Sequence, residues 1–274
     1  MSFVKSNFIE RCKSFRKKIL DISQTVEALH IGGAFSCMEI LDYIYFTHII
    51  PSLKTNNINK FILSKGHSAI AQFVILNFYK IISDKELSMY CKPGGILGCH
   101  PDYGAQGIEA STGSLGHGMG LATGICQGNK IKKNKSKLFL VISDGELQEG
   151  STWENMMMAA NLELDNLICY LDHNGSQSFG HTKVTHPKFY PIKEKILSFN
   201  WNCFECDGHN SEEIHNVTNQ VKVDGKKPTM IICNTTKGKG LSFAENDPIW
   251  HYRSPTPDEY KIGLKDLKQN KHEK

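Results

Sequence analysis

Two short apolar runs, with an amphipathic stretch between them, form the most informative pattern in the chain. KLFLVIS at 137–143 and NLICYLD at 166–172 are too short for buried helices. They are rich enough in Val, Ile, Leu and Phe to be inner strands of a parallel sheet. STWENMMMAANL at 151–162 has helical character, with Trp153, Met157 and Ala160 spaced for one helix face. The pattern predicts a strand, a crossover helix and a second parallel strand.

Periodic positions elsewhere predict further elements. Apolar residues that alternate spacings of four and three indicate a long first helix: Phe8, Cys12, Phe15, Ile19, Ile22, Val26 and Leu29. Ser36 and Glu39 are spaced as a capping box for a second helix. FILSKGHSAIAQFVILNFY is typical of a strand, a Gly-His turn and a helix, and GHGMGLATGICQG of a small-residue helix. WNCFECDG and PTMIICN are predicted strands, with the helix SEEIHNVTNQVK between them.

The alternation of strands and helices predicts an α/β fold with a mainly parallel central sheet. A chain of 274 residues exceeds the usual single-domain size but fits one large layered structure. We therefore expect one domain over residues 1–274, with residues 265–274 as a flexible tail.

Charge and hydropathy exclude two classes of partner. The net charge of +4 comes from the runs RCKSFRKK, KIKKNKSK and KDLKQNKHEK. None has interleaved aromatic residues suited to stacking on bases, so no nucleic-acid partner is predicted. No stretch approaches the length of a membrane-spanning helix, and the start lacks the apolar core of a signal peptide. We expect a cytoplasmic protein without a membrane partner.

The cysteines favour the same compartment. Nine is an odd number, and their spacing does not form a disulfide framework, so reduced thiols are expected. Cys203 and Cys206 form a CxxC pair inside a predicted strand, where positions three apart point to opposite faces. A zinc or redox role for this pair is therefore not expected.

Polar residues follow the two central strands at the points where they end. Asp144 and Gly145 follow the first strand, and Asn174 follows the second about thirty positions later. Ligands bind beyond the carboxyl ends of parallel strands, so both turns are expected to face one crevice. The Asp144 carboxylate, the Asn174 amide and the Ser176 backbone carbonyl offer the oxygen ligands that suit Mg²⁺. Gly145 allows a phosphate to approach the backbone. DG and NG turns are also ordinary loop chemistry, so this pattern alone leaves both interpretations open.

The pair SDGELQEG and DHNGSQ resembles the thiamine-diphosphate signature of transketolases. The resemblance implies a three-layer α/β/α thiamine-diphosphate-binding fold. It also implies that Asp144, Asn174 and the Ser176 carbonyl hold the Mg²⁺ that bridges the cofactor's diphosphate, a place that Ca²⁺ or Mn²⁺ could also take. Ser143 stands where the family usually has its first glycine.

Histidines in four other segments carry the same resemblance, in the family's order. They take catalytic positions by this resemblance: His30 in HIGG, His67 in the GH turn, His100 in CHPD, and His251 in WHYRSP. His67 and His251 would also contact the cofactor diphosphate. Imidazoles can hydrogen-bond sugar hydroxyls and move protons, because they serve as donor or acceptor near neutral pH.

Two further pieces match the family. In STGSLG, the backbone of Gly113, Ser114 and Leu115 would line the cofactor's aminopyrimidine ring. Glu149 matches an acidic position that in transketolases links active sites across the dimer. The alternative for Glu149 is an exposed carboxylate in the first turn of a helix, where the helix dipole favours it.

The resemblance covers only one part of a transketolase and implies the N-terminal subunit of a split enzyme. Such a subunit would use thiamine diphosphate and Mg²⁺ to move a two-carbon ketol unit from a ketose or ketose phosphate to an aldose. The pyrimidine-binding domain would come from a C-terminal partner subunit, and an α2β2 heterotetramer is expected. Arg253 and Lys237 are candidates for contact with a substrate phosphate.

Two alternatives remain open at this stage. A deoxyxylulose-phosphate-synthase-like enzyme would share these loops but join decarboxylated pyruvate to an aldehyde. A non-catalytic regulatory or binding subunit would keep the fold without the chemistry. The metal-ligand pattern at Asp144 and Asn174 argues against the second alternative, since a binding relic need not keep metal ligands.

Overall fold

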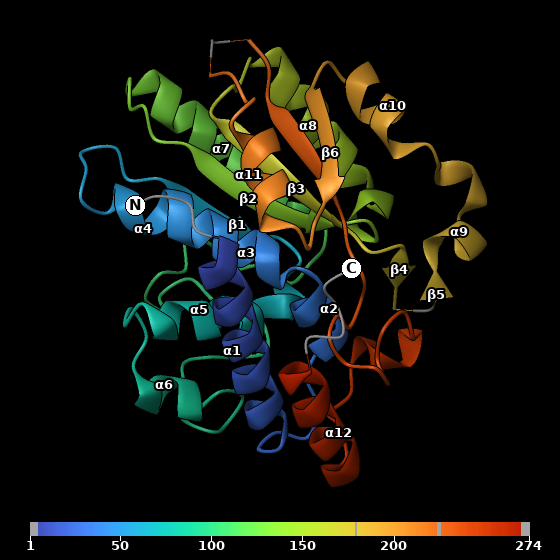
Figure 1. Cartoon of the computed structure of the whole chain (residues 1–274). Coiled ribbons are helices and arrows are strands. Elements are labelled where there is room, and N and C mark those ends of the chain that lie inside the picture. Colours follow the sequence, from blue (N-terminus) through green and yellow to red (C-terminus); the bar gives the residue numbers. More distant parts are fainter. Residues whose placement is uncertain (1–4, 179, 224–225, 270–274) are drawn as a thin grey trace.

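A parallel sheet forms the centre of the computed structural model, which describes residues 5–178, 180–223 and 226–269 (Figure 1). The strand order is β1-β2-β3-β7-β6, and each neighbouring pair is parallel. The strands are β1 (Lys60–Leu63), β2 (Leu138–Ser143), β3 (Leu167–His173), β6 (Asn202–Asp207) and β7 (Thr229–Asn234). The predicted α/β class and its parallel sheet are confirmed.

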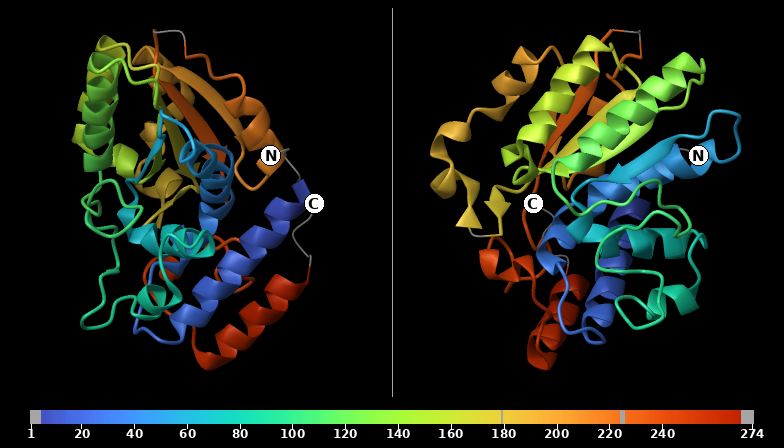
Figure 2. Two further views of the ribbon diagram at one scale, coloured as in Figure 1. Left: turned by 90° about the vertical axis from the view of Figure 1, so that its left-hand side faces the viewer. Right: turned by 180° about the vertical axis from the view of Figure 1, so that it is seen from behind.

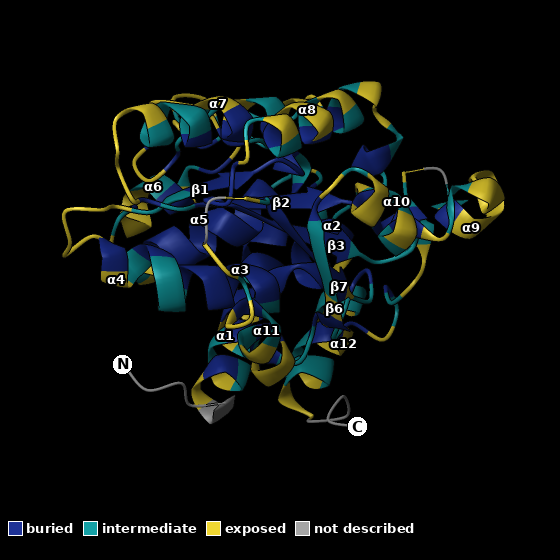
Figure 3. Cartoon of the chain, turned by 90° about the horizontal axis from the view of Figure 1, so that it is seen from above, coloured by how far each residue is buried: buried dark blue, intermediate teal, exposed yellow. Residues whose placement is uncertain are grey.

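Helices cover both faces of this sheet, because the inner strands are apolar on both sides. Along β2, Leu140 packs into one hydrophobic cluster, whereas Phe139 and Val141 pack into the other. One face is covered by α7 (His117–Ile131), α8 (Gly150–Asn161) and α10 (Ile192–Ser198). The other is covered by α1 (Lys5–Ser23), α3 (Met38–Ile44), α5 (Ala69–Phe78) and α11 (Ser211–Thr218). Figures 2 and 3 show the buried sheet between these two layers, which gives a three-layer α/β/α structure.

Shorter elements connect the layers. The remaining helical turns are α2 (Ile31–Ser36), η1 (Tyr45–Ile49), α4 (Ile50–Ser52), η2 (Gly66–Ser68), α6 (Asp84–Ser88), η3 (Glu146–Gln148), α9 (Thr182–Thr185), η4 (Pro187–Phe189) and η5 (Pro248–His251). A small antiparallel pair consists of β4 (Ser176–Gln177) and β5 (Gly180–His181). None of the helices in the described ranges is long and apolar enough to cross a membrane.

The end of the chain packs on its beginning. Helix α12 (Pro257–Lys268) lies against α1, and its Asp266 accepts hydrogen bonds from the backbone and hydroxyl of Ser242. Residues 265–268 of the predicted tail are therefore helical, whereas residues 270–274 lie outside the described residues.

Two predictions about helix ends were wrong. The first helix ends at Ser23, so Val26 and Leu29 lie beyond it. The Ser23 hydroxyl donates to the Leu20 carbonyl, a local bond that competes with helix continuation. The predicted capping box is absent, because Ser36 ends α2 and Cys37 is the N-cap of α3.

The buried face of α8 also differs from the prediction. Thr152, Met156 and Ala159 are buried, whereas Met157 is 55% exposed. Trp153 is only partly buried and donates its indole N–H to the Leu147 carbonyl. The apolar run around Met157 fits several helix faces, and contact with the sheet selects the face that carries Met156.

The side chains of Cys203 and Cys206 lie on opposite faces of β6, as predicted from their spacing. Cys203 packs toward the cluster beneath α8 and α10, whereas Cys206 lies in the opposite cluster, 3.8 Å from the Cys233 sulfur. All nine cysteines are free thiols. The CxxC spacing therefore places two thiols on opposite faces of β6.

The corrected helix face can be tested with adjacent methionines. We expect Met156→Ala to lower the free energy of unfolding by about 2–5 kcal/mol, because it opens a cavity under α8. Met157→Ala should change it by less than about 0.5 kcal/mol, because that side chain is exposed. Urea unfolding of the full-length chain measures both, and equal costs for the two variants would contradict the assigned face.

Candidate active site

The carboxyl ends of β1, β2 and β3 open into one crevice. Because the strands are parallel, the turns that follow them meet at the same edge of the sheet. A cavity of about 530 Å³ lies there, and it is lined by residues from all three turns and from more distant loops. Its lining includes most of the predicted site residues: His30, His67, His100, Gly113, Leu115, Gly145, Glu149, Asn174, Ser176 and His251.

The two predicted metal-binding turns are in direct contact. Asp144 Oδ2 accepts a hydrogen bond from the Gly175 amide at 2.6 Å, and Oδ1 accepts one from the Gly145 amide at 3.0 Å. Asn174 Oδ1 accepts one from the Ser176 amide at 3.0 Å. Asp144 is buried just behind the cavity wall. The carboxylate and the amide oxygen therefore lie on adjoining turns.

This donor set fits a hard divalent cation. Each carboxylate or amide oxygen has a second lone pair beyond the bond already made. Within the described ranges, no cluster of three or more His, Cys, Asp or Glu is arranged to hold a metal. One carboxylate with neutral oxygens is instead the type of site at which Mg²⁺ keeps water and phosphate oxygens. Burial raises the pKa of Asp144 to about 6, and a bound cation would favour its ionised form.

A buried ion pair lies beneath these turns. Lys65 donates to Asp172 and, at 3.0 Å, to the Gly33 carbonyl. Asp172 also accepts hydrogen bonds from Ser36 and Thr235. Burial opposes both charges, but their mutual attraction raises the pKa of Lys65 and lowers that of Asp172. Both groups are therefore charged at neutral pH, and the network ties four chain segments together.

The network also orients the predicted metal ligand Asn174. Its side-chain nitrogen lies 3.3 Å from Asp172 Oδ2 and 3.4 Å from Ser36 Oγ. Since Asp172 is a carboxylate, the amide nitrogen must face it, and this fixes the opposite orientation for the amide oxygen. Asp172 and Lys65 were missed by the sequence analysis, although a charged residue at the end of an apolar strand was an available signal.

Four predicted histidines gather on one side of the cavity. The His30 ring centroid lies 5.2 Å from that of His67, 5.2 Å from that of His251 and 6.2 Å from that of His100. Burial lowers the pKa of His30 to about 3, with neighbouring His251 adding to the effect. Burial, then nearby lysines, lowers the pKa of His251 to about 4 and that of His67 far below its ordinary value. These three rings are neutral at pH 7.

Lys237 adds a second cation to the lining. It is 2% exposed, and its ammonium lies 3.3 Å from His251 Nδ1 and 3.4 Å from the Gln177 carbonyl. Burial, then repulsion from Lys65, lowers the pKa of Lys237 to about 8. An anion in the cavity would relieve this repulsion, so the site favours a negatively charged ligand.

The backbone of the glycine-rich loop lies against His100. Gly113 has a φ of +143°, and a Cβ there would lie 2.8 Å from His100 Cδ2. A Cβ on Gly66 would lie 2.8 Å from the Gly113 nitrogen. Gly113 requires glycine because of its positive φ and its contact with the His100 ring, and Gly66 requires it because its backbone touches that of the other loop. Ser114 is exposed and lies outside the cavity lining, unlike its neighbours Gly113 and Leu115.

Glu146 is a further carboxylate that the sequence analysis missed. It is fully buried, bonds to Ser64 and accepts from the Gly116 amide at 2.9 Å, behind the glycine-rich loop. Burial raises its pKa to about 7, against the hydrogen bonds that favour its ionised form. Glu149, by contrast, is exposed at the start of α8 and lines the cavity.

The two candidates for substrate phosphate contact have different surroundings. Lys237 faces the cavity, as described above. Arg253 instead pairs with both carboxylate oxygens of Glu259, at 2.8 and 2.7 Å, and stacks on Trp250. Its guanidinium is outside the cavity lining, so the structure does not place it for phosphate contact.

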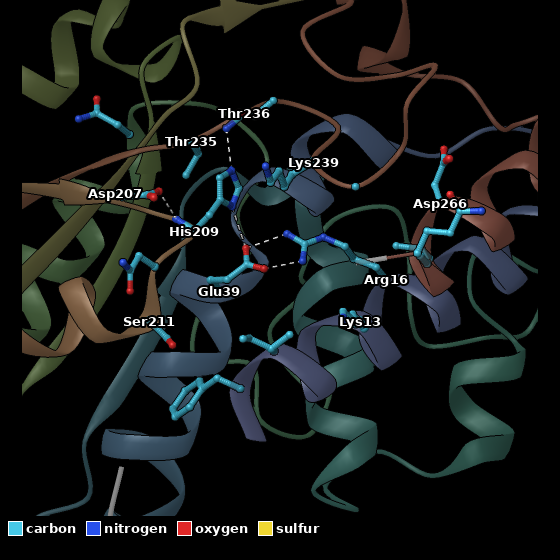
Figure 4. Close-up of a pocket in the computed structure, with 17 residues that line it drawn as sticks. Lys13, Arg16, Glu39, Asp207, His209, Ser211, Thr235, Thr236, Lys239 and Asp266 are labelled. Atoms are coloured by element: carbon cyan, nitrogen blue, oxygen red, sulfur yellow. Dashed lines mark hydrogen bonds and ion pairs between the residues drawn. The ribbon is translucent and has the colours of Figure 1, made fainter. Parts of the chain in front are cut away.

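A second cavity, of about 830 Å³, opens beyond the carboxyl ends of β6 and β7 (Figure 4). Its wall holds Arg16, which pairs with Glu39, and His209, whose Nδ1 lies 3.0 Å from Glu39 Oε2. None of the predicted site residues lines it. The smaller cavity is therefore the candidate active site, although the second one is larger.

The fold and the crevice together define an α/β/α domain with an anion-binding site at the carboxyl ends of its parallel strands. The chain belongs to the transketolase family: the model for "Transketolase, thiamine diphosphate binding domain" matches residues 10–261. This confirms the resemblance stated from the sequence.

Two curated relatives are single subunits of about the same length. The chain is 32% identical over 257 residues to one subunit of the apulose-4-phosphate transketolase of Phocaeicola vulgatus, covering 93% of this chain and 91% of that protein. It is 33% identical over 246 residues to the 6-deoxy-6-sulfo-D-fructose transketolase subunit SqwG of a Clostridium species, covering 88% of each.

Longer transketolases match over only part of their length. The human transketolase is 31% identical over 242 residues, which cover 86% of this chain but 38% of that protein. A solved transketolase from Campylobacter jejuni superposes with a TM-score of 0.88 at 23% identity. The alignment covers 98% of this chain and 43% of that one. The chain therefore spans less than half of these longer proteins, and the second comparison supports the fold.

The histidine environment gives a pH prediction. Without ligand, His30, His67 and His251 should stay neutral down to about pH 5, whereas free imidazole titrates at about 6.5. In the unfolded chain the three histidines take up protons at about pH 6.5, whereas in the folded chain they stay neutral. Protonation therefore stabilises the unfolded chain, and the free energy of unfolding falls as pH decreases below about 6.5. Nitrogen-15 NMR of labelled histidine measures the ring states, and titration of these rings at about pH 6.5 would contradict the prediction.

The buried ion pair gives a stability prediction. We expect Asp172→Asn to lower the free energy of unfolding by about 3–5 kcal/mol, because it leaves the Lys65 charge buried without a counter-charge. The double variant Lys65→Met/Asp172→Asn should recover part of that loss, since no buried charge remains. Asp258→Asn, at an exposed carboxylate, is the control and should cost less than about 1 kcal/mol. Urea unfolding decides, and a double variant no more stable than Asp172→Asn would argue against the pairing.

Proposed function

We propose that this chain is the N-terminal subunit of a split transketolase that holds thiamine diphosphate and Mg²⁺. The observation that carries the proposal is one crevice in which the Asp144 and Asn174 turns face buried lysines and neutral histidines. Oxygen ligands suit the cation, and fixed positive charges suit a diphosphate. The two relatives named as transketolase subunits have about the same length as this chain, which supports the split arrangement.

Each group has a role in this proposal. Asp144, Asn174 and the Ser176 carbonyl hold the cation, while Gly145 admits the diphosphate to the backbone. His67, His251 and Lys237 contact its oxygens, and Lys65, neutralised by Asp172, holds the loops beneath them in place. The backbone of the 113–115 loop lines the aminopyrimidine. Glu149 is placed at the exposed rim, where it is available to link to a second active site.

When bound, thiamine diphosphate would supply the carbanion chemistry that ketol transfer between sugars requires. The chain contributes binding, orientation and proton transfer. Because His30 and His251 are neutral, each can donate one hydrogen bond to a sugar oxygen and accept another. His100 lies beside His30 at the same wall and completes the set of groups that orient the sugar.

The substrates are proposed to be sugars that carry an anionic group. The two short relatives are named for a sugar phosphate and for a sulfo sugar. Activity is proposed to require a C-terminal partner that carries the pyrimidine-binding domain, in an α2β2 assembly in the cytoplasm. The free state of all nine cysteines agrees with a reducing compartment.

Cofactor titration tests the proposal. With the partner present, we expect saturable binding of thiamine diphosphate that requires Mg²⁺, followed by circular dichroism or fluorescence. Asp144→Ala should weaken it by at least about 100-fold, because even indirect partners of metal ligands are worth 10–100-fold. Asp258→Asn should bind as the wild type does. Binding that is indifferent to Asp144, or full ketol transfer by the isolated chain, would overturn the proposal.

A further inference from the structure

One ring beside the crevice is not an imidazole. The Tyr252 ring centroid lies 4.5 Å from that of His30, with the two ring planes tilted by 37°. The next rings, those of His67 and His251, each lie at 5.2 Å from His30. Tyr252 is half-exposed and is outside the cavity lining, so it contacts His30 without forming the cavity wall itself. Among the described residues it has the closest ring contact with His30, and the proposed function gives it no role.

No hydrogen bond fixes the His30 ring within the described part of the chain. Its Nδ1 is buried without a partner, so Nε2 is the ring nitrogen available to the cavity. His251, by contrast, has its Nδ1 at 3.3 Å from Lys237 Nζ. A histidine ring is commonly oriented by the hydrogen bond that one of its nitrogens makes. His30 lacks such a bond, so the packing of neighbouring rings must set its orientation.

The backbone fixes Tyr252 beside His30. An isolated parallel bridge joins His30 to Arg253, and the Arg253 amide donates to the Leu29 carbonyl at 3.1 Å. The Arg253 guanidinium in turn stacks on the buried Trp250 ring, 4.2 Å from its centroid. Tyr252 immediately precedes this anchored residue. The phenol ring therefore has a fixed place against the imidazole.

We propose that Tyr252 is a positioning residue, whose ring holds the His30 imidazole in the orientation in which Nε2 reaches the sugar. The effect on catalysis rests on the proposed transketolase function, whereas the packing that orients His30 does not. The Tyr252 hydroxyl forms no hydrogen bond in the described ranges, so the ring is the part of the side chain that matters.

The orientation matters because the two edges of an imidazole differ. A rotation of about 180° about the Cβ–Cγ bond exchanges the positions of ring nitrogens and ring carbons. A loosely held His30 would therefore spend part of its time with a C–H group where the sugar needs a nitrogen. Groups that take part in a reaction must be held within about 0.5 Å and 10–20° of the productive geometry. Contact with Tyr252 restricts this rotation.

The same contact excludes water from His30. Burial is the main cause of the low pKa of His30, and the phenol ring contributes to that burial. Loss of the ring should therefore raise the pKa of His30 toward its ordinary value. The other titratable groups around His30 stay in place in such a variant: His67, His100, His251, Lys65 and Lys237.

Histidine NMR of the isolated full-length chain provides the direct test. We expect Tyr252→Ala to raise the pH at which His30 titrates by at least about one unit, because water then reaches the ring. Tyr252→Phe keeps the ring and should match the wild type. Ile249→Ala is the control, since Ile249 is an exposed side chain in the same segment. Signals of His48, which stacks on the core residue Phe139, report an intact fold. An unchanged titration of His30 in Tyr252→Ala would overturn the proposal.

An activity measurement tests whether Tyr252 acts through His30. With partner and cofactor present, Tyr252→Ala should lower kcat by about three- to tenfold, the scale of one aromatic pair. KM should change by less than about twofold, because the lost interaction orients a group for the reaction and does not bind the ground state. Tyr252→Phe should restore the rate.

A double-variant cycle completes this test. In a His30→Ala background, Tyr252→Ala should cause no further loss, because the residue that it positions is gone. Losses that add independently would overturn the positioning role. A wild-type assembly without ketol transfer would count against the transketolase function, while the NMR titration would still decide whether Tyr252 holds His30.

Discussion

The crevice depends on one buried ion pair, between Lys65 and Asp172. Two charges removed from water are costly unless they pair closely and their other bonds are satisfied. Here Asp172 also binds hydroxyls of Ser36 and Thr235, and Lys65 also binds the Gly33 carbonyl. The pair therefore fixes the chain after β1, the end of β3, the α2 turn and the loop after β7 relative to one another. The loops that form the candidate active site depend on this network, because the sheet alone would not hold them in place.

The electrostatic character of the crevice follows from the same arrangement. Lys65 is neutralised by Asp172, whereas Lys237 forms no ion pair within the described part of the chain and borders neutral imidazoles. Burial and the lysines together keep protons off the histidines. The result is a pocket that attracts an anion through lysine and backbone groups, while its imidazoles remain free to donate and accept hydrogen bonds. The positive charge thus comes from lysine and backbone groups, whereas the neutral imidazoles contribute hydrogen bonds within the same small volume.

The sequence pattern was sufficient for the strands and for their parallel order in an α/β fold, whereas the set of His30, His67, His100 and His251 followed from the family resemblance. Short apolar runs can be recognised in the sequence as strands, and the turns that follow parallel strands meet at one edge of the sheet. It was insufficient where tertiary contacts decide between local options. Met156 and Met157 fit a helix equally well, and only contact with the sheet chooses between them. The Ser36 and Glu39 spacing satisfied a capping rule, yet both side chains are committed to partners far away in sequence. The position of Lys65 after an apolar strand marks it as a candidate, but its pairing with Asp172, more than a hundred positions later, cannot be seen in any local pattern.

The loop after β7 separates the two cavities, and its three consecutive residues face different neighbours. Thr235 bonds to Asp172 beneath the smaller cavity, the Thr236 amide bonds to His209 beside the larger one, and Lys237 lines the smaller one. The two cavities therefore share this loop as a wall, and hydrogen bonds on both sides of the loop fix its position. A shift of one residue along this loop would withdraw Lys237 from the crevice and break the contact with His209 at the same time. Redesign of the larger cavity is consequently confined to its other walls, since the shared loop cannot be rebuilt for one cavity without altering the other.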